Sequence, residues 1–161
     1  MPEFIMLIGL PGSGKSTYTD ALIAGNPDKD YVILSTDNMI EEKAKAAGKT
    51  YSEIFPSVNV NFLTKEMKAQ FRKALAEGRN IVLDRTNMSA KKRKEFLDAL
   101  PENYEKIAVV FSIPDTLLKK RLAHREKTTG KSIPPMVITT MARSYVAPTK
   151  DEFDKIITIN S

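Results

Sequence analysis

Residues 4–17 read FIMLIGLPGSGKST, an apolar run followed by a glycine-rich turn that ends in Lys-Ser-Thr. The run suits a buried strand, and the turn from Gly9 to Ser16 satisfies the phosphate-binding pattern G-x-x-x-x-G-K-[ST]. Backbone N–H groups of such a turn point inward, and the helix that follows adds unsatisfied amides and the positive end of its dipole. The residues expected to contact a nucleotide here are Gly9, Pro11, Gly12, Ser13, Gly14, Lys15, Ser16 and Thr17. The sequence therefore predicts that the chain binds a nucleoside triphosphate.

Two residues of this loop have specific roles in the pattern. Lys15 supplies a mobile charge for the β- and γ-phosphates, and the Ser16 hydroxyl is suited to bind Mg²⁺. ATP, or another nucleoside triphosphate, and Mg²⁺ are therefore the expected cofactors. The alternative, a chance glycine loop in a non-binding domain, is disfavoured because a strand and a plausible helix flank the turn.

The composition is that of an ordinary globular protein. The 161 residues are 42% apolar and 28% charged, so we expect a single domain over 1–161. No apolar run approaches the roughly 20 residues of a membrane span. The absence of cysteine excludes disulfides and thiolate metal sites and fits a reducing cytoplasm. The net charge of +5 is compatible with nucleic acid as a partner. The sequence does not indicate the oligomeric state.

Strands alternate with helices along the chain. Strands are predicted over 4–8, 31–35, 80–84, 106–111 and 155–159. Helices are predicted over 15–24, 36–47, 52–77 with a break near Pro56, 89–101, 115–127 and from Pro134 or Pro135 to about 145. In the long stretch Phe62, Met67, Phe71, Ala74 and Leu75 are expected to face inward, and 128–131 is expected to be a flexible turn. Because each strand is an unbroken apolar run, the pattern predicts an α/β fold whose parallel sheet is covered on both faces.

Two carboxylates follow predicted strands. Asp84 ends one strand, at the position where phosphate-loop enzymes hold Mg²⁺; a turn or cap carboxylate is the alternative. Asp37 follows another strand, so the sheet brings it to the same carboxyl edge as the loop. A carboxylate there can accept the proton of an attacking hydroxyl. The alternative for Asp37 is a cap of the following helix.

Two basic clusters suit phosphate chemistry. Between Ile113 and Lys131 there are six Lys or Arg against two acids, and Arg121 and Arg125 lie four residues apart on one helix face. This region, about 115–135, suits a helical lid whose arginines neutralise a transferring phosphoryl group, although most such runs are solvated faces. Arg85 and the run 91–94 form the second cluster, which could contact acceptor phosphates or be an exposed helix face.

The order of four segments resembles the polynucleotide 5′-hydroxyl kinases, the phage-type enzymes and the kinase modules of nucleic-acid repair (end-healing) proteins. These segments are GLPGSGKS at 9–16, STD at 35–37, LDRTN at 83–87 and KRLAHR at 120–125, and APTKDEFD at 147–154 extends the similarity. The resemblance implies an adenylate-kinase-like P-loop domain with a parallel sheet of four or five strands and a helical lid. It implies transfer of the γ-phosphate of ATP to a 5′-hydroxyl end of DNA or RNA.

The resemblance also implies roles for individual residues. Asp37 matches the general base, and Lys15 and Arg125 match the groups that stabilise the transferring phosphoryl, with Arg121 beside them on the nucleotide. Arg85 and Thr86 fall where the acceptor strand enters, and Ser16 with Asp84 would hold the metal.

The sequence departs from the phage enzymes beside the catalytic aspartate. Thr36 and Ile40 stand where those enzymes carry arginines, one of which holds acceptor phosphate. Two other interpretations therefore stay open. One is a related kinase whose acceptor is a nucleoside, a small metabolite or a hydroxylated base in DNA. The other is a catalytically idle nucleotide-binding interaction domain.

Overall fold

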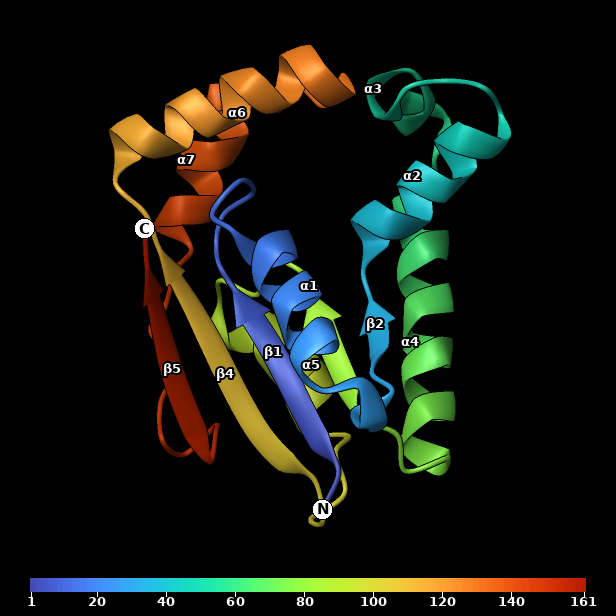
Figure 1. The fold of residues 1–161 in the computed structure, drawn as a ribbon, viewed down its shortest axis with the longest axis vertical. Coiled ribbons are helices and arrows are strands. Elements are labelled where there is room, and N and C mark those ends of the chain that lie inside the picture. The colour runs from blue at the N-terminus through green and yellow to red at the C-terminus, as the bar shows by residue number, and fades with distance from the viewer.

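A five-stranded sheet forms the centre of the computed structural model, which describes residues 1–161 (Figure 1). All strand pairings are parallel, and the strand order is β2-β3-β1-β4-β5. The strands are β1 (Glu3–Ile8), β2 (Val32–Leu34), β3 (Ile81–Asp84), β4 (Glu105–Ser112) and β5 (Lys155–Asn160). The predicted parallel α/β fold is confirmed.

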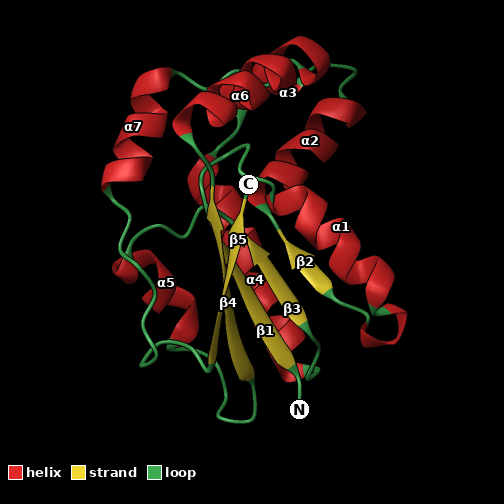
Figure 2. Cartoon of the chain, turned by 60° about the vertical axis from the view of Figure 1, so that its left-hand side comes forward, coloured by secondary structure: helices red, strands yellow, loops and turns green.

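Seven α-helices connect or cover the strands (Figure 2). They are α1 (Lys15–Gly25), α2 (Thr36–Ala46), α3 (Tyr51–Ile54), α4 (Val60–Ala76), α5 (Ala90–Leu97), α6 (Asp115–Thr129) and α7 (Pro135–Arg143). Two short 3₁₀ helices cover Pro27–Lys29 and Phe55–Ser57. None of the helices has the length and hydrophobicity that crossing a membrane requires.

The centre of the sheet is buried on both faces because helices pack on each side, whereas the edge strand β5 is largely exposed. Phe4, Met6 and Ile8 of β1 belong to a cluster of 15 buried residues that also contains side chains of α4 and α5. Ile5 and Leu7 point to the other face, where they join a smaller cluster against α1. Alternate residues of one strand thus enter two cores, which explains why the strand is a continuous apolar run.

The carboxyl ends of the strands meet at one edge, beneath α6 (Figure 1). Leu7 of β1 pairs in register with Asp84 of β3, so the phosphate loop and Asp84 leave the sheet side by side. The N–H of Gly9 donates to the carbonyl of Thr86 at 3.1 Å, which joins the two loops beyond the strands. The residues predicted to carry chemistry therefore lie at the edge where open α/β sheets bind ligands.

The predicted helix over 52–77 is three elements in the structure. Thr50 and Glu53 form a capping box that starts α3, and the 3₁₀ turn that contains Pro56 follows it. Asn59 then starts α4 by accepting a hydrogen bond from the N–H of Phe62. These caps start new helical segments on either side of the predicted break.

Two local predictions are wrong. Phe62 was expected to face inward, but it is 55% exposed. The buried stripe of α4 instead runs through Leu63, Met67, Phe71 and Ala74. Phe62 precedes Leu63 by one residue, so its side chain is rotated by about 100° around the helix axis, away from this stripe. Thr128 and Thr129 were expected in a flexible turn but lie in α6, which ends at Gly130 in the left-handed conformation.

Candidate active site

The phosphate loop owes its shape to two glycines with positive φ. Gly12 has φ 82° and Gly14 has φ 106°, a region that other residues rarely adopt. Gly14 is also the N-cap of α1, so the amides at the start of this helix face the loop. A Cβ on Gly12 would come within 3.1 Å of Leu122, because α6 packs directly on the loop. The loop and the helix that carries the predicted lid arginines are therefore in contact.

Lys15 is held at the centre of the site. Its Nζ donates to the carbonyl of Gly9 at 2.9 Å, which folds the side chain back over the loop. Burial lowers the pKa of the Lys15 ammonium, and the carboxylates of Asp84 and Asp37 oppose that shift. The ammonium thus lies near two acids at the phosphate loop, where it can contact a phosphate oxygen.

Two cavities meet at this point. The first has a volume of about 720 Å³ and is lined by the phosphate loop, the start of α1, both lid arginines and the end of β5. The second has a volume of about 470 Å³ and extends from the loop toward α3, α5 and α7. The residues that line both are Pro11, Lys15, Asp37, Asp84, Arg125 and Lys131. A donor in the first cavity and an acceptor in the second would meet beside these six side chains.

Asp37 lies in the first turn of α2 but does not cap that helix. The cap is Ser35, whose Oγ accepts from the N–H of Asn38, so the predicted alternative role of Asp37 as a cap is wrong. The Asp37 side chain is 51% exposed, and its Oδ2 lies 3.9 Å from Arg125 Nη2. Its Oδ1 accepts a hydrogen bond from Tyr51 Oη at 2.7 Å. The carboxylate is therefore oriented by two side chains and open to both cavities.

Asp84 ends β3 and is close enough to Lys15 to interact with it electrostatically. Burial raises the pKa of its carboxyl, and the nearby Lys15 ammonium opposes that shift. Ser16 lines the first cavity together with this carboxylate. No cluster of three or more His, Cys, Asp or Glu forms a protein cage for a metal. One carboxylate and one hydroxyl fit Mg²⁺, which usually takes one or two carboxylates, water and substrate phosphates.

The predicted lid arginines lie above the loop. Arg121 Nη1 comes within 3.7 Å of the place where a Cβ of Gly14 would be, and Arg121 lines the first cavity only. Arg125, one helical turn further, lines both cavities. The structure thus brings both arginines to the phosphate loop, and it places one of them where the cavities meet.

The predicted acceptor cluster is only partly assembled. Arg85, Thr86 and Lys92 line the second cavity. The Arg85 guanidinium lies 5.7 Å from the centre of the Phe96 ring, and burial lowers its pKa. Lys94 instead makes an i,i+4 ion pair on the outer face of α5.

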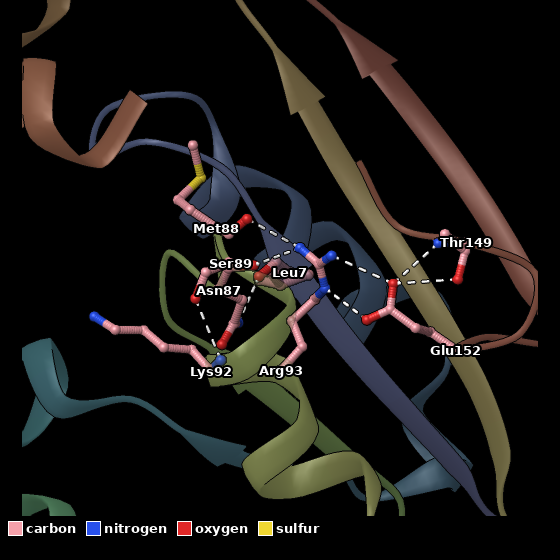
Figure 3. Close-up of polar contacts among 8 residues, drawn as sticks. All are labelled: Leu7, Asn87, Met88, Ser89, Lys92, Arg93, Thr149 and Glu152. Atoms are coloured by element: carbon pink, nitrogen blue, oxygen red, sulfur yellow. Dashed lines mark hydrogen bonds and ion pairs between the residues drawn. The ribbon is translucent and has the colours of Figure 1, made fainter. Parts of the chain in front are cut away.

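Arg93 is neither an acceptor contact nor part of an exposed face, so both predicted roles for it are wrong. Its side chain is fully buried and forms two hydrogen bonds to Glu152, at 3.0 and 3.3 Å (Figure 3). Its Nη1 donates to the carbonyls of Asn87 and Met88, both at 3.1 Å. Asn87 has φ 50° and donates to the carbonyl of Leu7 at 2.7 Å. Arg93 therefore supports the loop that presents Arg85 and Thr86.

Sequence reasoning missed the apolar wall of the second cavity. Tyr51 and Phe55 stack with ring centres 5.8 Å apart, and Val137 and Met141 of α7 line the same cavity. Phe55 and Val137 are 45% and 38% exposed. The sequence did contain one indication of this surface, because Tyr51 and Phe55 lie four residues apart directly after the helix-capping residue Thr50.

A family model described as an AAA domain (AAA_33) matches residues 4–148. Human heterogeneous nuclear ribonucleoprotein U-like protein 2 is 26% identical over 157 residues, which cover 94% of this chain and 20% of that protein. A putative bifunctional polynucleotide phosphatase/kinase of Acanthamoeba polyphaga mimivirus is 29% identical over 165 residues, covering 98% of this chain and 33% of that protein. The chain thus spans a fifth to a third of the length of these relatives.

Solved structures share the fold at low sequence identity. A putative kinase from Chloroflexus aurantiacus superposes with a TM-score of 0.72 at 18% identity, covering 99% of this chain and 85% of that one. A chain of the Pnkp1/Rnl/Hen1 RNA repair complex gives 0.67 at 24% identity, covering 95% and 46%. A gluconokinase from Sinorhizobium meliloti gives 0.57 at 18% identity, covering 99% and 82%. P-loop kinases with different acceptors therefore have this architecture in common.

Proposed function

The chain belongs to the AAA_33 family and is a P-loop kinase of that type, and from this premise we propose that it phosphorylates the 5′-hydroxyl end of DNA or RNA. The observation that carries the proposal is the meeting of two cavities at Lys15, Asp37 and Arg125. Such a junction lets a nucleotide and an alcohol approach one another from opposite sides. It also puts a carboxylate and two cations beside the atoms that react.

In the proposed reaction each residue has a separate task. Asp37 takes the proton of the acceptor hydroxyl, whose oxygen forms a bond to the γ-phosphorus. The bond from that phosphorus to the β–γ bridging oxygen breaks, and ADP leaves with the electron pair. Lys15 and Arg125 stabilise the charge on the transferring group. Ser16 and Asp84 would hold Mg²⁺, which supplies further neutralisation of phosphate charge when bound.

The lining of the second cavity supports a polynucleotide acceptor. Phe55, Val137 and Met141 form an apolar wall, whereas Arg85 and Lys92 contribute positive charge. A nucleotide has both a planar base and a phosphate, and stacking on an aromatic side chain contributes about 1–3 kcal/mol per base. A sugar acid such as gluconate carries a negatively charged carboxylate, which could pair with these cations, but it has no apolar face that could pack against such a wall. The viral phosphatase/kinase relative and the RNA repair neighbour also support this acceptor class.

A smaller acceptor is the second candidate, and one observation favours it. Thr36 lines the second cavity, and Ile40 is buried at 3% exposure, so α2 offers no cation to the acceptor. A nucleoside or a small metabolite would need less positive charge than a strand, and a hydroxylated base within DNA is a further acceptor that stays open. A nucleotide-binding domain without turnover is the remaining alternative.

An acceptor panel separates these functions. Transfer of labelled γ-phosphate from ATP is measured to 5′-hydroxyl DNA and RNA oligonucleotides, nucleosides and gluconate, with Lys15→Ala as the inactive control. We expect transfer to the oligonucleotides and none to the same oligonucleotides bearing a 5′-phosphate. Transfer to nucleosides or gluconate alone contradicts the acceptor, and no transfer to any compound supports the idle domain.

A further inference from the structure

Lys131 is the third cation at the junction of the two cavities. It lines both of them, as Lys15 and Arg125 do, although it lies beyond the end of α6 in sequence. We propose that Lys131 is a further catalytic residue, which contacts the phosphoryl group in transit together with Lys15 and Arg125. The proposal deepens the proposed function and rests on phosphoryl transfer taking place at this junction.

The backbone around Lys131 is fixed against α3. Gly130 adopts φ 72°, and a Cβ at this position would come within 3.2 Å of Thr50. The hydroxyl of Ser52 donates to the Gly130 carbonyl and accepts from the N–H of Ser132 at 3.2 Å. These contacts hold the residues on both sides of Lys131, so its side chain enters the junction from a defined position.

The Lys131 side chain is buried among groups that suit a mobile charge. It is only 11% exposed, and its Nζ lies 5.1 Å from the centre of the Tyr51 ring. It pairs with Glu41, whose own side chain is 43% exposed and lines the first cavity alone. Burial lowers the pKa of Lys131, and the neighbouring Asp37 carboxylate opposes that shift. A cation with a half-exposed partner can exchange that partner for phosphate oxygens at little cost.

The charge balance at the junction favours a further cation beside the transferring phosphoryl group. Asp37 and Asp84 offset the charges of Lys15 and Arg125, so these four groups together carry no net charge. A phosphoryl group in transit spreads its negative charge over three equatorial oxygens. Lys131 adds the positive charge that the four groups lack. It accepts no proton and forms no covalent bond, because its role is electrostatic.

A simple latch is the competing explanation. In that case the ion pair of Lys131 with Glu41 only closes the lid segment onto α2, and removing either partner has the same effect. If Lys131 contacts the phosphoryl group, loss of Glu41 is harmless, because the carboxylate competes with phosphate for the ammonium. The two partners therefore give different results when they are changed separately.

The test uses ADP and ADP with aluminium fluoride, which mimics the transferring phosphoryl group and requires no acceptor. Dissociation constants are measured by calorimetry in Mg²⁺ for the whole chain and for Lys131→Met, Glu41→Gln and Lys127→Met. Lys127 is exposed on α6 and lines neither cavity, so its variant is the matched control. We expect Lys131→Met to bind the fluoride complex at least tenfold more weakly and ADP alone within twofold of wild type. Lys127→Met stays within twofold of wild type for both ligands, and Glu41→Gln binds the fluoride complex at least as tightly as wild type, because the competing carboxylate is gone.

Several results overturn the proposal, and each has a distinct meaning. If Glu41→Gln and Lys131→Met weaken binding of the fluoride complex equally, the ion pair only closes the lid segment onto α2. Unchanged binding of the fluoride complex by Lys131→Met removes Lys131 from the reaction but leaves the proposed function intact. A wild type that gains no affinity from fluoride contradicts phosphoryl transfer itself. If Lys131→Met melts early, Lys131→Gln, which keeps a donor for Glu41, carries the same test.

Discussion

Tyr51 donates a hydrogen bond from its hydroxyl to Asp37 Oδ1 at 2.7 Å, across the gap between α3 and α2. Burial and the adjacent carboxylate raise the pKa of Tyr51, so the phenol is a protonated donor at neutral pH. Arg125 approaches the other oxygen of the same carboxylate. Tyr51 and Arg125 thus orient the two oxygens of the proposed base, and an acceptor hydroxyl would bind to Asp37 between these two side chains.

Removing the Tyr51 hydroxyl is expected to lower kcat without raising the KM for the acceptor. Tyr51→Phe keeps the ring but leaves one Asp37 oxygen without its donor, and a hydrogen bond of about 1 kcal/mol corresponds to roughly a fivefold lower kcat. Tyr51→Leu also removes the stacking partner of Phe55 and is expected to raise the KM for an oligonucleotide. Steady-state kinetics of the two variants measure this split. Equal kinetic constants for Tyr51→Phe and wild type would show that the hydrogen bond has no positioning role.

The two carboxylates at the junction are expected to differ in their metal response. Asp37→Asn removes the proton acceptor, so kcat falls by about 10²-fold or more while ATP affinity is nearly unchanged. Since Ser35 is the cap of α2, this substitution leaves the helix intact. Asp84→Asn instead raises the Mg²⁺ concentration needed for half-maximal activity, and high Mg²⁺ partly restores the rate. Titration of Mg²⁺ in both variants checks this, and identical curves would argue against separate roles.

The architecture could be predicted because it depends on local signals that tertiary contacts reinforce. Unbroken apolar strands, the glycine pattern and the position of Asp84 after a strand all follow from backbone geometry and burial on two faces. Asp37 reached the correct edge for the same reason, because parallel strands end at one side of a sheet. The phosphate loop, Asp84 and Asp37 were therefore predictable from their places along the chain.

The acceptor side could not be predicted in the same way. Charge along a helix does not show which residues face inward, so Arg93 was grouped with Lys92 although it pairs with Glu152, 59 residues later. The contact of Tyr51 with Asp37 depends on how the loop after α2 folds back, and that is set by tertiary packing. Long-range pairing of polar side chains leaves no periodic trace in the sequence.

Breaking the buried pair of Arg93 and Glu152 is expected to destabilise the fold. Arg93→Met leaves the carboxylate of Glu152 without its cationic partner and the carbonyl of Asn87 without its donor, at a cost of about 3–5 kcal/mol. Lys94→Met on the exposed face of the same helix is the control and is expected to change stability by less than about 0.5 kcal/mol. Urea unfolding measures both free energies. An Arg93→Met protein as stable as the control would mean that the network does not support the loop.

Glu3 provides a pH-dependent contribution to stability far from the site. Burial raises the pKa of its carboxyl, but the hydrogen bonds donated by Lys29 and Tyr31 outweigh that effect and leave the pKa below its ordinary value. A lowered pKa stabilises the fold above the ordinary value of 4.5, and this stabilisation is lost as the pH falls through the folded-state pKa. Glu3→Gln is therefore expected to be about 1 kcal/mol less stable than wild type at pH 7.

The control for Glu3 is Glu42→Gln, which changes an exposed carboxylate on α2 that makes no ion pair. Thermal melts of wild type and both variants are compared at pH 7 and pH 3. The deficit of Glu3→Gln should shrink at the lower pH, because the stabilisation by the charged carboxylate is lost as the pH falls through its lowered folded-state pKa. A deficit that is equally large at both pH values would assign the effect to packing and not to charge.

Two neighbouring lysines test whether the acceptor is a strand. Lys92 lines the second cavity, whereas Lys91 is exposed and lines neither cavity, so Lys92→Glu and Lys91→Glu make the same charge change in two places. If Lys92 contacts an acceptor phosphate, its variant raises the KM for an oligonucleotide more than that for ATP. Each lost phosphate contact also reduces the salt dependence of oligonucleotide affinity by about 0.7 in the logarithmic slope. Affinities at several salt concentrations give this slope for wild type and both variants. Equal effects of the two substitutions would indicate only a long-range field, and a flat salt response in wild type would favour a small acceptor with no phosphate backbone.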